Sequence, residues 1–307
     1  MNRTEKLLGL LLGLALITGA AAMIWPYLYM VSGSLKMGAE YETYKRDLLP
    51  PRLSPFVDDE EKERLTDDSR RRYLRQKGVD QPEPLLKNYI DAFEYGRVHV
   101  YLFNSFLYAI VATAGQLLLN SLAAYAFARI QFKGRDFLFG LILSTMMLPP
   151  AVLLVPQFLV AQALGLVDTF WGVVVPAFGG AFGIFMLRQF FLNIPRTLED
   201  AAMIDGCTRL GILFRIVLPL AKPALITLGL FVFLGTWNSF VWPLVILSDW
   251  DKYPLTVGLS LYREEAGGVG WPRIFAASAL GSLPLIGLFL GAQRYLVGGL
   301  TFSGIKQ

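Results

Sequence analysis

Carboxylate side chains are concentrated in one short polar stretch, LEDAAMIDG at residues 198–206, which contains Glu199, Asp200 and Asp205. Three carboxylates among apolar residues could dock a partner protein. Metal binding and acid/base catalysis have no convergent partner in view for His99, the only histidine of the chain. The stretch is therefore considered first as a docking element.

The same stretch predicts a short helix. Thr197 precedes Asp200 by three residues, the spacing at which a hydroxyl caps a helix and a carboxylate reaches back to the cap. The helix dipole favours negative charge in a first turn by roughly 0.3–1 kcal/mol. Gly206, the residue type most tolerant of positive φ, then ends the helix after about two turns. Within it, Glu199, Asp200 and Asp205 argue for a protein partner.

A second helix is predicted directly after Gly206, because apolar residues recur there with helical spacing. Its expected apolar face consists of Leu210, Leu213, Phe214, Val217 and Leu218. Pro219 and Pro223 mark the return to the next apolar run. Two short helices at an angle favour a docking element over a helix lying on lipid, since lipid-surface helices favour Lys and Arg on their polar face.

Long apolar runs flank this loop. Of the 307 residues, 54% are hydrophobic and 17% are charged, and the mean hydropathy is +0.48, a balance typical of membrane proteins. A helix needs roughly 20 apolar residues to cross hydrocarbon. Six runs reach this length: about 7–31, 100–128, 137–164, 169–191, 223–247 and 274–297. None alternates like a barrel strand, so the sequence predicts an all-α membrane protein with six transmembrane helices.

The first run also has features of a cleavable signal peptide, because Arg3 and Lys6 precede LLGLLLGLALI and the small residues GAAA follow it. Apolar character continues through MIWPYLYMV to Val31, which is longer than the apolar core of a signal peptide. We therefore expect a retained first span.

The positions of lysine and arginine predict the orientation. With the N-terminus inside, the inner segments carry twelve Lys and Arg against five Asp and Glu, while the whole chain has a net charge of +4. This excess follows the positive-inside rule. Both termini and the 192–222 loop are then cytoplasmic, and the 32–99 segment is extracytoplasmic. The rule explains the basic balance without nucleic-acid binding, so no nucleic-acid partner is expected.

The polar loop resembles a known motif: EAA, three residues, Gly, nine residues and I-x-L-P, found in membrane subunits of bacterial ABC importers. Here it reads DAA, MID, Gly206, CTRLGILFR and IVLP, with Asp200 in place of the usual Glu. Further segments are similar to permeases of the carbohydrate-uptake, MalG-like branch: 25–36, 104–135, 147–172, 235–249, 253–259 and the ending GGLTFSGIKQ. Together they cover nearly all of the chain outside roughly 37–86.

This resemblance implies the MetI-like fold of ABC importer permeases and a division of labour. An extracytoplasmic binding protein would deliver a sugar or oligosaccharide, and a second permease subunit, expected to form a heterodimer with this chain, would complete the path. Two ATP-binding subunits would power transport in the bacterial inner membrane. The loop would be the coupling helix that enters a cleft on the ATPase. The candidate docking residues would then be Glu199, Asp200, Ala201, Ala202, Met203, Asp205 and Gly206.

The expected organisation follows from the runs and the resemblance. A cytoplasmic tip and first span occupy 1–31, and an extracytoplasmic segment occupies 32–99. A five-span core with the coupling loop 192–222 occupies 100–297, and a cytoplasmic tail occupies 298–307.

Neutral polar side chains within the runs are candidates for the path of a polyhydroxy substrate, which needs amides, hydroxyls and aromatic faces more than charges. They are Asn104, Asn120, Tyr125, Gln157, Trp237, Asn238 and Ser239. Polar residues in membrane helices also bond across helices, worth roughly 0.6–2 kcal/mol, and Trp anchors at interfaces. A purely structural role therefore stays open for each of them.

Two sets of small or helix-breaking residues mark special positions in the runs. Pro149, Pro150 and Pro156 break the third run, where a broken helix either lines a transport path or forms a passive kink. GGAFG at 179–183 and GLFLG at 287–291 place small residues four apart, which predicts close helix packing.

The segment at roughly 37–86 carries mixed charges between prolines and predicts a solvated excursion, with KERLTDDSRRRYLRQ at 62–76 as a candidate helix. Contact with the binding protein or the partner permease is one hypothesis, and a passive loop is the other.

Nothing in the sequence predicts a catalytic role. The runs hold almost no ionisable residues that could couple transport to protons or sodium, and the pattern G-x-x-x-x-G-K-[ST] for ATP does not occur. Energy is therefore expected from a partner subunit, and no cofactor or metal is expected. The alternative interpretation is a non-transport receptor or channel subunit that signals through the 198–218 loop, and export is the rival within transporters.

Overall fold

A computed structural model describes residues 3–36, 41, 47–50, 86–94, 96–265 and 270–301. Helices are the only regular secondary structure in these ranges, which confirms the all-α class. The candidate helix at 62–76 lies outside the described residues. The chain packs as two units. One consists of Met1–Val98 with Leu259–Leu283, and the other consists of His99–Gly258 with the chain from Pro284 onward.

The first unit joins the end of the N-terminal helix to two later segments. Its elements are α1 (Arg3–Ser34), α4 (Lys87–Glu94), the end of α15 (Leu255–Glu265) and the first half of α16 (Trp271–Thr301). The buried amide of Asn88 donates to the carbonyls of Ser34 and Lys36, both at 2.8 Å. Phe275 packs edge-on against Tyr29, with ring centroids 6.0 Å apart. The Asn88 amide thus pairs the carbonyl of Ser34, the last residue of α1.

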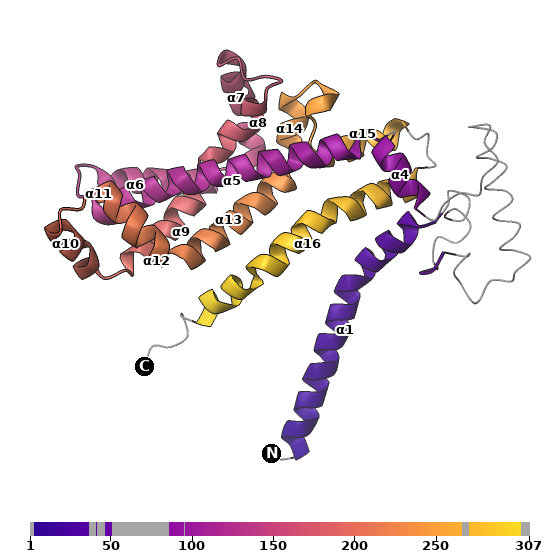
Figure 1. Cartoon of the computed structure of the whole chain (residues 1–307), viewed down its shortest axis with the longest axis horizontal. Helices are drawn as coiled ribbons and strands as arrows, with labels where there is room; N and C mark the ends of the chain where they lie inside the picture. Colours follow the sequence, from indigo (N-terminus) through magenta and orange to yellow (C-terminus); the bar gives the residue numbers. More distant parts are fainter. Residues whose placement is uncertain are drawn as a thin grey trace, which may run out of the picture. The chain divides into compact units, whose positions relative to one another are not determined.

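The second unit is built along one long helix, α5 (Val98–Arg129) (Figure 1). After it come α6 (Arg135–Ser144), η2 (Thr145–Met147), α7 (Pro150–Ala163), α8 (Phe170–Val174), η3 (Val175–Phe178), α9 (Ala181–Leu192) and α10 (Arg196–Ile204). Then follow α11 (Arg209–Ile212), η4 (Leu213–Val217), α12 (Leu218–Leu220), α13 (Lys222–Trp237), α14 (Val241–Ile246) and η5 (Trp250–Lys252). Figure 1 shows α10 and α11 at the Arg129 end of α5.

Three helices are long and apolar enough to cross a bilayer alone: Leu11–Ser34, Val98–Arg129 and Trp271–Gln293. Three bent pairs pass the same test only together: Arg135–Met147 with Pro150–Ala163, Phe170–Phe178 with Ala181–Leu192, and Arg209–Leu220 with Lys222–Trp237. The number of spans among the described residues reaches the predicted six if each pair is one crossing.

The third predicted run is broken at its prolines. The two helices of this run meet at 109°, and Leu148 and Pro149 between them have extended backbone conformations. Pro150 occupies the first position of α7, where its missing N–H costs nothing. Pro156 lies inside α7. The predicted break is thus confirmed at Pro149 and Pro150, but not at Pro156.

The predicted bounds of the fifth run, 223–247, are wrong. Helix α13 ends at Trp237, and α14 begins only at Val241. At this break the Leu234 carbonyl accepts both the backbone N–H and the side-chain amide of Asn238, at 3.0 and 2.9 Å. On the other side, α13 meets the preceding helical segment at 83°, at Ala221.

The largest core of the second unit lies at the Arg129 end of α5. It is formed by α5, α9, α13 and the segment from α10 to α12. Its buried members include Ala124, Ala128, Leu187, Phe191, Ile212, Leu213, Val217 and Leu228. The polar loop of the sequence is therefore packed as an integral part of the bundle end, and α10 is held by this core.

Candidate functional site

Helix α10 begins at Arg196, directly after Pro195, and its first turn has no side-chain cap. The predicted Thr197 cap with Asp200 reaching back is therefore wrong. Pro195 and Arg196 start the helix before Thr197, so this threonine already lies inside the first turn. Glu199 is consequently directed inward, while Asp200 remains exposed.

Glu199 is buried and forms an ion pair with Arg129 at the end of α5. The Arg129 Nε to Glu199 Oε1 distance is 2.6 Å, and the Tyr125 hydroxyl donates to Glu199 Oε2 at 3.1 Å. The Arg129 guanidinium also donates to the carbonyls of Phe191 and Ile194, at 2.7 and 2.6 Å. One guanidinium thus ties α5, the end of α9 and the start of α10 together. Buried charges are tolerated when they are paired and hydrogen-bonded in this way.

Gly206 ends α10 as the sequence predicts. Its φ is +82°, its N–H donates to the Met203 carbonyl at 3.1 Å, and the Cys207 N–H donates to the Ala202 carbonyl at 2.9 Å. These two bonds and the left-handed glycine form a Schellman motif. The chain therefore turns sharply between α10 and α11.

The second predicted helix exists, and its predicted apolar face is only partly buried. Leu213 and Val217 are buried, whereas Leu210 and Phe214 are 60% and 49% exposed. Residues Leu213–Val217 form a π-helical turn, with Leu213 and Val217 at its two ends. The N-cap is Thr208, whose hydroxyl accepts from the Gly211 N–H at 3.1 Å. Neither feature is evident from apolar periodicity.

The exposed side of α10 is apolar with an acidic edge. We call it the α10 surface and define it by Leu198, Asp200, Ala201, Met203, Ile204 and Asp205, all of which are exposed. Ile204 is the extreme case, with 87% of its surface exposed. Of the other candidate docking residues, Glu199 and Ala202 are buried and Gly206 forms the bend. Such a surface at the end of a packed helix is typical of a protein contact.

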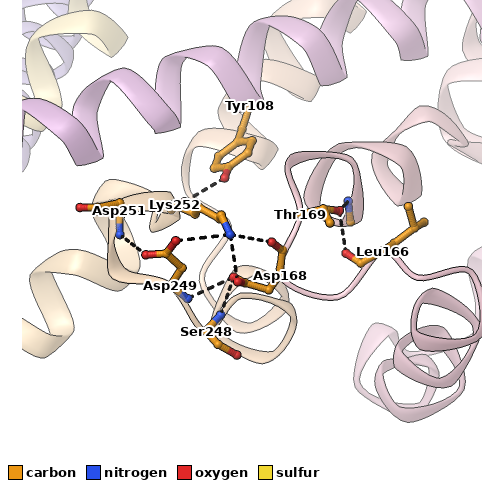
Figure 2. Close-up of polar contacts among 9 residues, drawn as sticks. Tyr108, Leu166, Asp168, Thr169, Ser248, Asp249, Asp251 and Lys252 are labelled. Carbon is orange, nitrogen blue, oxygen red and sulfur yellow. Dashed lines mark hydrogen bonds and ion pairs between the residues drawn. The ribbon is translucent and has the colours of Figure 1, made fainter.

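A second polar cluster joins the loop after α7 to the loop after α14 (Figure 2). Asp168, with a φ of 55°, accepts from the backbone N–H groups of Ser248 and Asp249 at 3.0 and 3.1 Å and pairs with Lys252 at 2.9 Å. The Ser248 N–H bond, the Lys252 ammonium and the Asp249 N–H bond lower the pKa of Asp168 to about 2. The same contact with Asp168 raises the pKa of Lys252.

Helix α5 connects this cluster to the Arg129 end. The Tyr108 hydroxyl donates to the Lys252 carbonyl at 2.8 Å, and the Asn104 amide donates to the Asp251 carbonyl at 2.7 Å. Tyr108 and Arg129 are 21 residues apart on one helix, which corresponds to about 30 Å at 1.5 Å per residue. This equals the thickness of the hydrocarbon core of a bilayer. The two clusters therefore have the spacing expected of opposite membrane surfaces.

A pocket of about 420 Å³ lies within the second unit. Its wall is formed by α5, α7, α8, η3, α9, α13 and α14. The lining residues are Gln116, Gln157, Val173, Pro176, Ala177, Gly179, Phe182, Leu228, Phe231, Val232, Gly235, Thr236, Ser239 and Trp242. The volume lies within the range of roughly 300–1,000 Å³ of small-molecule sites.

Two of the seven candidate path residues line this pocket, Gln157 and Ser239. Tyr125 and Asn104 lie in the polar clusters at the two ends of α5. Trp237 is buried and stacked on Phe233, with centroids 5.7 Å apart. The roles of all seven as path residues stay predictions.

The remaining two candidates, Asn120 and Asn238, do not line the pocket, and two residues that do line it were not predicted. Asn120 is buried, and Asn238 bonds its own helix. Gln116 and Thr236 also line the pocket and were missed by the sequence analysis, although Gln116 is a neutral polar side chain in an apolar run like the candidates.

Comparison with known proteins shows to which family the chain belongs. Residues 116–301 match the family described as the binding-protein-dependent transport system inner membrane component. The chain belongs to this family. It is a multi-pass membrane protein of the transporter permease type, as the resemblance of its motif and segments indicated.

Two named relatives of this chain are also transport system permeases. The sulfoquinovosyl glycerol transport system permease protein SmoH of Agrobacterium fabrum is 40% identical over 225 residues, 73% of this chain and 79% of SmoH. The arabinooligosaccharides transport system permease protein AraQ of Halalkalibacterium halodurans is 39% identical over 222 residues, 72% of this chain and 79% of AraQ.

A solved structure shows the same architecture. A chain of a bacterial ABC transporter involved in the import of the acidic polysaccharide alginate matches with a TM-score of 0.77 and 25% identity. The match covers 96% of this chain and 98% of that chain. The predicted ABC importer permease fold is thereby confirmed.

Proposed function

We propose that this chain is a permease subunit of an ATP-driven importer that moves a sugar or oligosaccharide across the bacterial inner membrane. The relatives named above are permeases for sugar-containing cargo, and membership of the family implies delivery by an extracytoplasmic binding protein. A second permease subunit and two ATP-binding subunits complete the assembly. The chain itself has no catalytic role in this proposal.

The α10 surface carries the proposal. An apolar surface with Ile204 at its centre is exposed on a helix that a buried Arg129–Glu199 ion pair fixes to α5. Movement of a partner bound to α10 would therefore be transmitted to a helix that extends the full thickness of the bilayer. The N-terminus, the C-terminus and α10 lie on the cytoplasmic side in this proposal, because the excess of Lys and Arg falls there.

The residue expected to meet the ATPase is Asp200, together with Met203 and Ile204. Glu199 acts behind it as a positioning residue, since its carboxylate is held inside by Arg129 and Tyr125. In the resemblance to the EAA motif the carboxylate at Asp200 is one methylene shorter than Glu, and its exposure is compatible with a direct contact.

Co-purification tests this function. A tagged chain expressed with its neighbouring transport genes should retain an ATP-binding subunit, and Ile204→Glu should reduce the retained ATPase by roughly tenfold or more, as for a central interface residue. Asp200→Lys should also reduce the amount of ATPase that is retained. Asp136→Lys, an exposed acid on α6, is the matched control and should change nothing. Absence of any ATPase from the wild-type preparation would contradict the proposal and favour a receptor or channel subunit.

A further inference from the structure

We infer that the pocket between α7, α9 and α13 is a binding site for a neutral saccharide unit and that the cargo of this chain is a neutral sugar, not an acidic one. The inference rests on the proposed function and goes beyond it by naming the substrate class and the site. It places this chain with AraQ, which is named for arabinooligosaccharides. It separates the chain from SmoH, whose sulfoquinovosyl cargo carries a sulfonate, and from the matched structure, which is named for the acidic polysaccharide alginate.

The polar groups of the pocket suit hydroxyl groups. Gln116 and Gln157 offer amides that both donate and accept, and Thr236 and Ser239 offer hydroxyls that do the same. Within the described part of the chain, neither glutamine side chain has a hydrogen-bond partner. These groups approach from three different helical segments, so several hydroxyls of one sugar ring could be bonded at once.

Aromatic rings occupy other parts of the same wall. Phe182, Phe231 and Trp242 all line the pocket. The Trp242 indole N–H is already used, since it donates to the Gly172 carbonyl at 3.1 Å, and this bond fixes the ring against α8. An aromatic face and convergent amides are the combination expected of a site for a ring with an apolar face and polar edges.

No ionisable side chain lines the pocket among the described residues. Three basic residues of this unit have other partners. Arg129 pairs with Glu199, Lys252 pairs with Asp168, and Arg188 donates to the Phe127 carbonyl and stacks over Phe139. The N-terminus of α9 near Gly179 offers at most about half an elementary charge. An anion that enters an apolar pocket needs a full counter-charge to offset its desolvation. The lining residues supply none, so the pocket discriminates against acidic cargo.

A buried amide lies beside the pocket but is not part of its lining. The Asn120 side chain is 1% exposed, and its Nδ2 has no hydrogen-bond partner among the described residues. It lies against Gly180 and Gly183, next to the pocket residue Gly179. The helix is broken at this point, with a 41° bend between η3 and α9. Irregular backbone at membrane depth is tolerated where it lines a polar cavity.

Cysteine protection tests the inference directly. Cys207 is the only cysteine of the chain, so Ala177→Cys and Gly235→Cys, at lining positions whose side chains offer no hydrogen bond to the sugar, are each made in a Cys207→Ala background, in the complex purified with its ATPase. The alkylation rate of this subunit is measured with maltotriose, arabinotriose and trehalose as neutral probes, and with trigalacturonate and glycerol 3-phosphate as anionic probes. Ser248→Cys is the matched control, because Ser248 is exposed and lies outside the pocket.

We expect at least one neutral probe to slow alkylation at both pocket positions, roughly tenfold at ten times its Kd, while Ser248→Cys and the anionic probes show no effect. Protection by an anionic probe, or by none of the five, would overturn the inference. Because the complex contains the ATPase in either case, such a result would leave the proposed importer function intact. Loss of the ATPase from the preparation would instead count against the proposed function.

Discussion

Arg129 and Glu199 form a buried ion pair, with 2.6 Å between Nε and Oε1, that joins the last residue of α5 to the first turn of α10. The side chains are only 4% and 8% exposed. The acidic residue beside Glu199, Asp200, is exposed. Two adjacent carboxylates of one helix thus have different environments, and this difference separates a positioning residue from a contact residue.

Removing the charge of Glu199 should destabilise the protein. Glu199→Gln leaves the Arg129 guanidinium without its counter-charge, which costs about 3 kcal/mol at buried pairs. Asp200→Asn, the adjacent control, should change stability by less than about 0.5 kcal/mol, as for surface substitutions in general. Thermal unfolding in detergent measures both. Equal effects of the two substitutions would show that the pair is not buried in solution.

Gly206 should be sensitive to residue type for a backbone reason alone. Its φ of +82° costs other L-residues about 1–2 kcal/mol, although no other atom lies within 4 Å of a Cβ added there. Gly206→Val should therefore lower both stability and ATPase retention. Gly206→Asn is the control, because asparagine tolerates the left-handed conformation. If the valine variant behaves like the asparagine variant, the Schellman turn does not determine the position of α10.

The lengths of the apolar runs and the positions of glycine and proline were enough to predict the helices and several of their ends. Apolar runs of bilayer length identified the helices, Gly206 identified the end of α10, and Pro149–Pro150 identified the break before α7. The direction of Glu199 could not be predicted, because each residue turns a helix by about 100° and the start of α10 at Arg196 was missed. Register errors of one residue therefore exchange the buried and exposed carboxylates.

The pocket was only partly predictable for a different reason. Gln157 and Ser239 belong to α7 and to the segment after α13, and their approach depends on tertiary packing. Gln116 satisfied the same criterion as the chosen candidates, but only the packing of α5 against Gly180 distinguishes it. The π-helical turn at Leu213–Val217 likewise has no marker in apolar spacing, and neither has the exposure of Leu210 and Phe214.

The two glycine pairs predicted for close packing should respond differently to alanine. A Cβ at Gly183 would overlap the buried Asn120 side chain, whereas nothing in the described structure lies within 4 Å of a Cβ at Gly287. Gly183→Ala should lower stability by about 1–3 kcal/mol, as overpacking does. Gly287→Ala, in the middle of α16, should be neutral or stabilise by up to about 1 kcal/mol. The thermal unfolding midpoints of the two variants measure these effects. Equal effects would contradict close packing at Gly183.

Asp168 should stabilise the two loops that it joins in a pH-dependent manner. Its pKa of about 2 lies below the ordinary value of 3.8, so its contribution is complete above about pH 4 and is lost as the pH falls through 2. Lys252 has a raised pKa, so its contribution is complete below its ordinary value and is lost only at more alkaline pH. The cluster should therefore have constant strength between about pH 5 and 9.

Asp168→Asn tests this dependence. The variant loses an anionic acceptor for two backbone N–H groups and for Lys252, which we expect to cost about 1–2 kcal/mol at pH 7. The difference from wild type in thermal unfolding should persist from pH 9 to pH 5 and shrink between pH 4 and pH 2, because the Asp168 carboxylate of the unfolded chain, with its ordinary pKa of 3.8, takes up a proton there before the folded one does. Asp136→Asn is the control, since its exposed pair with Arg135 should contribute little at any pH. A difference that stays the same at pH 2.5 would mean that the Asp168 charge does not stabilise the cluster, and that shape alone holds the loops together.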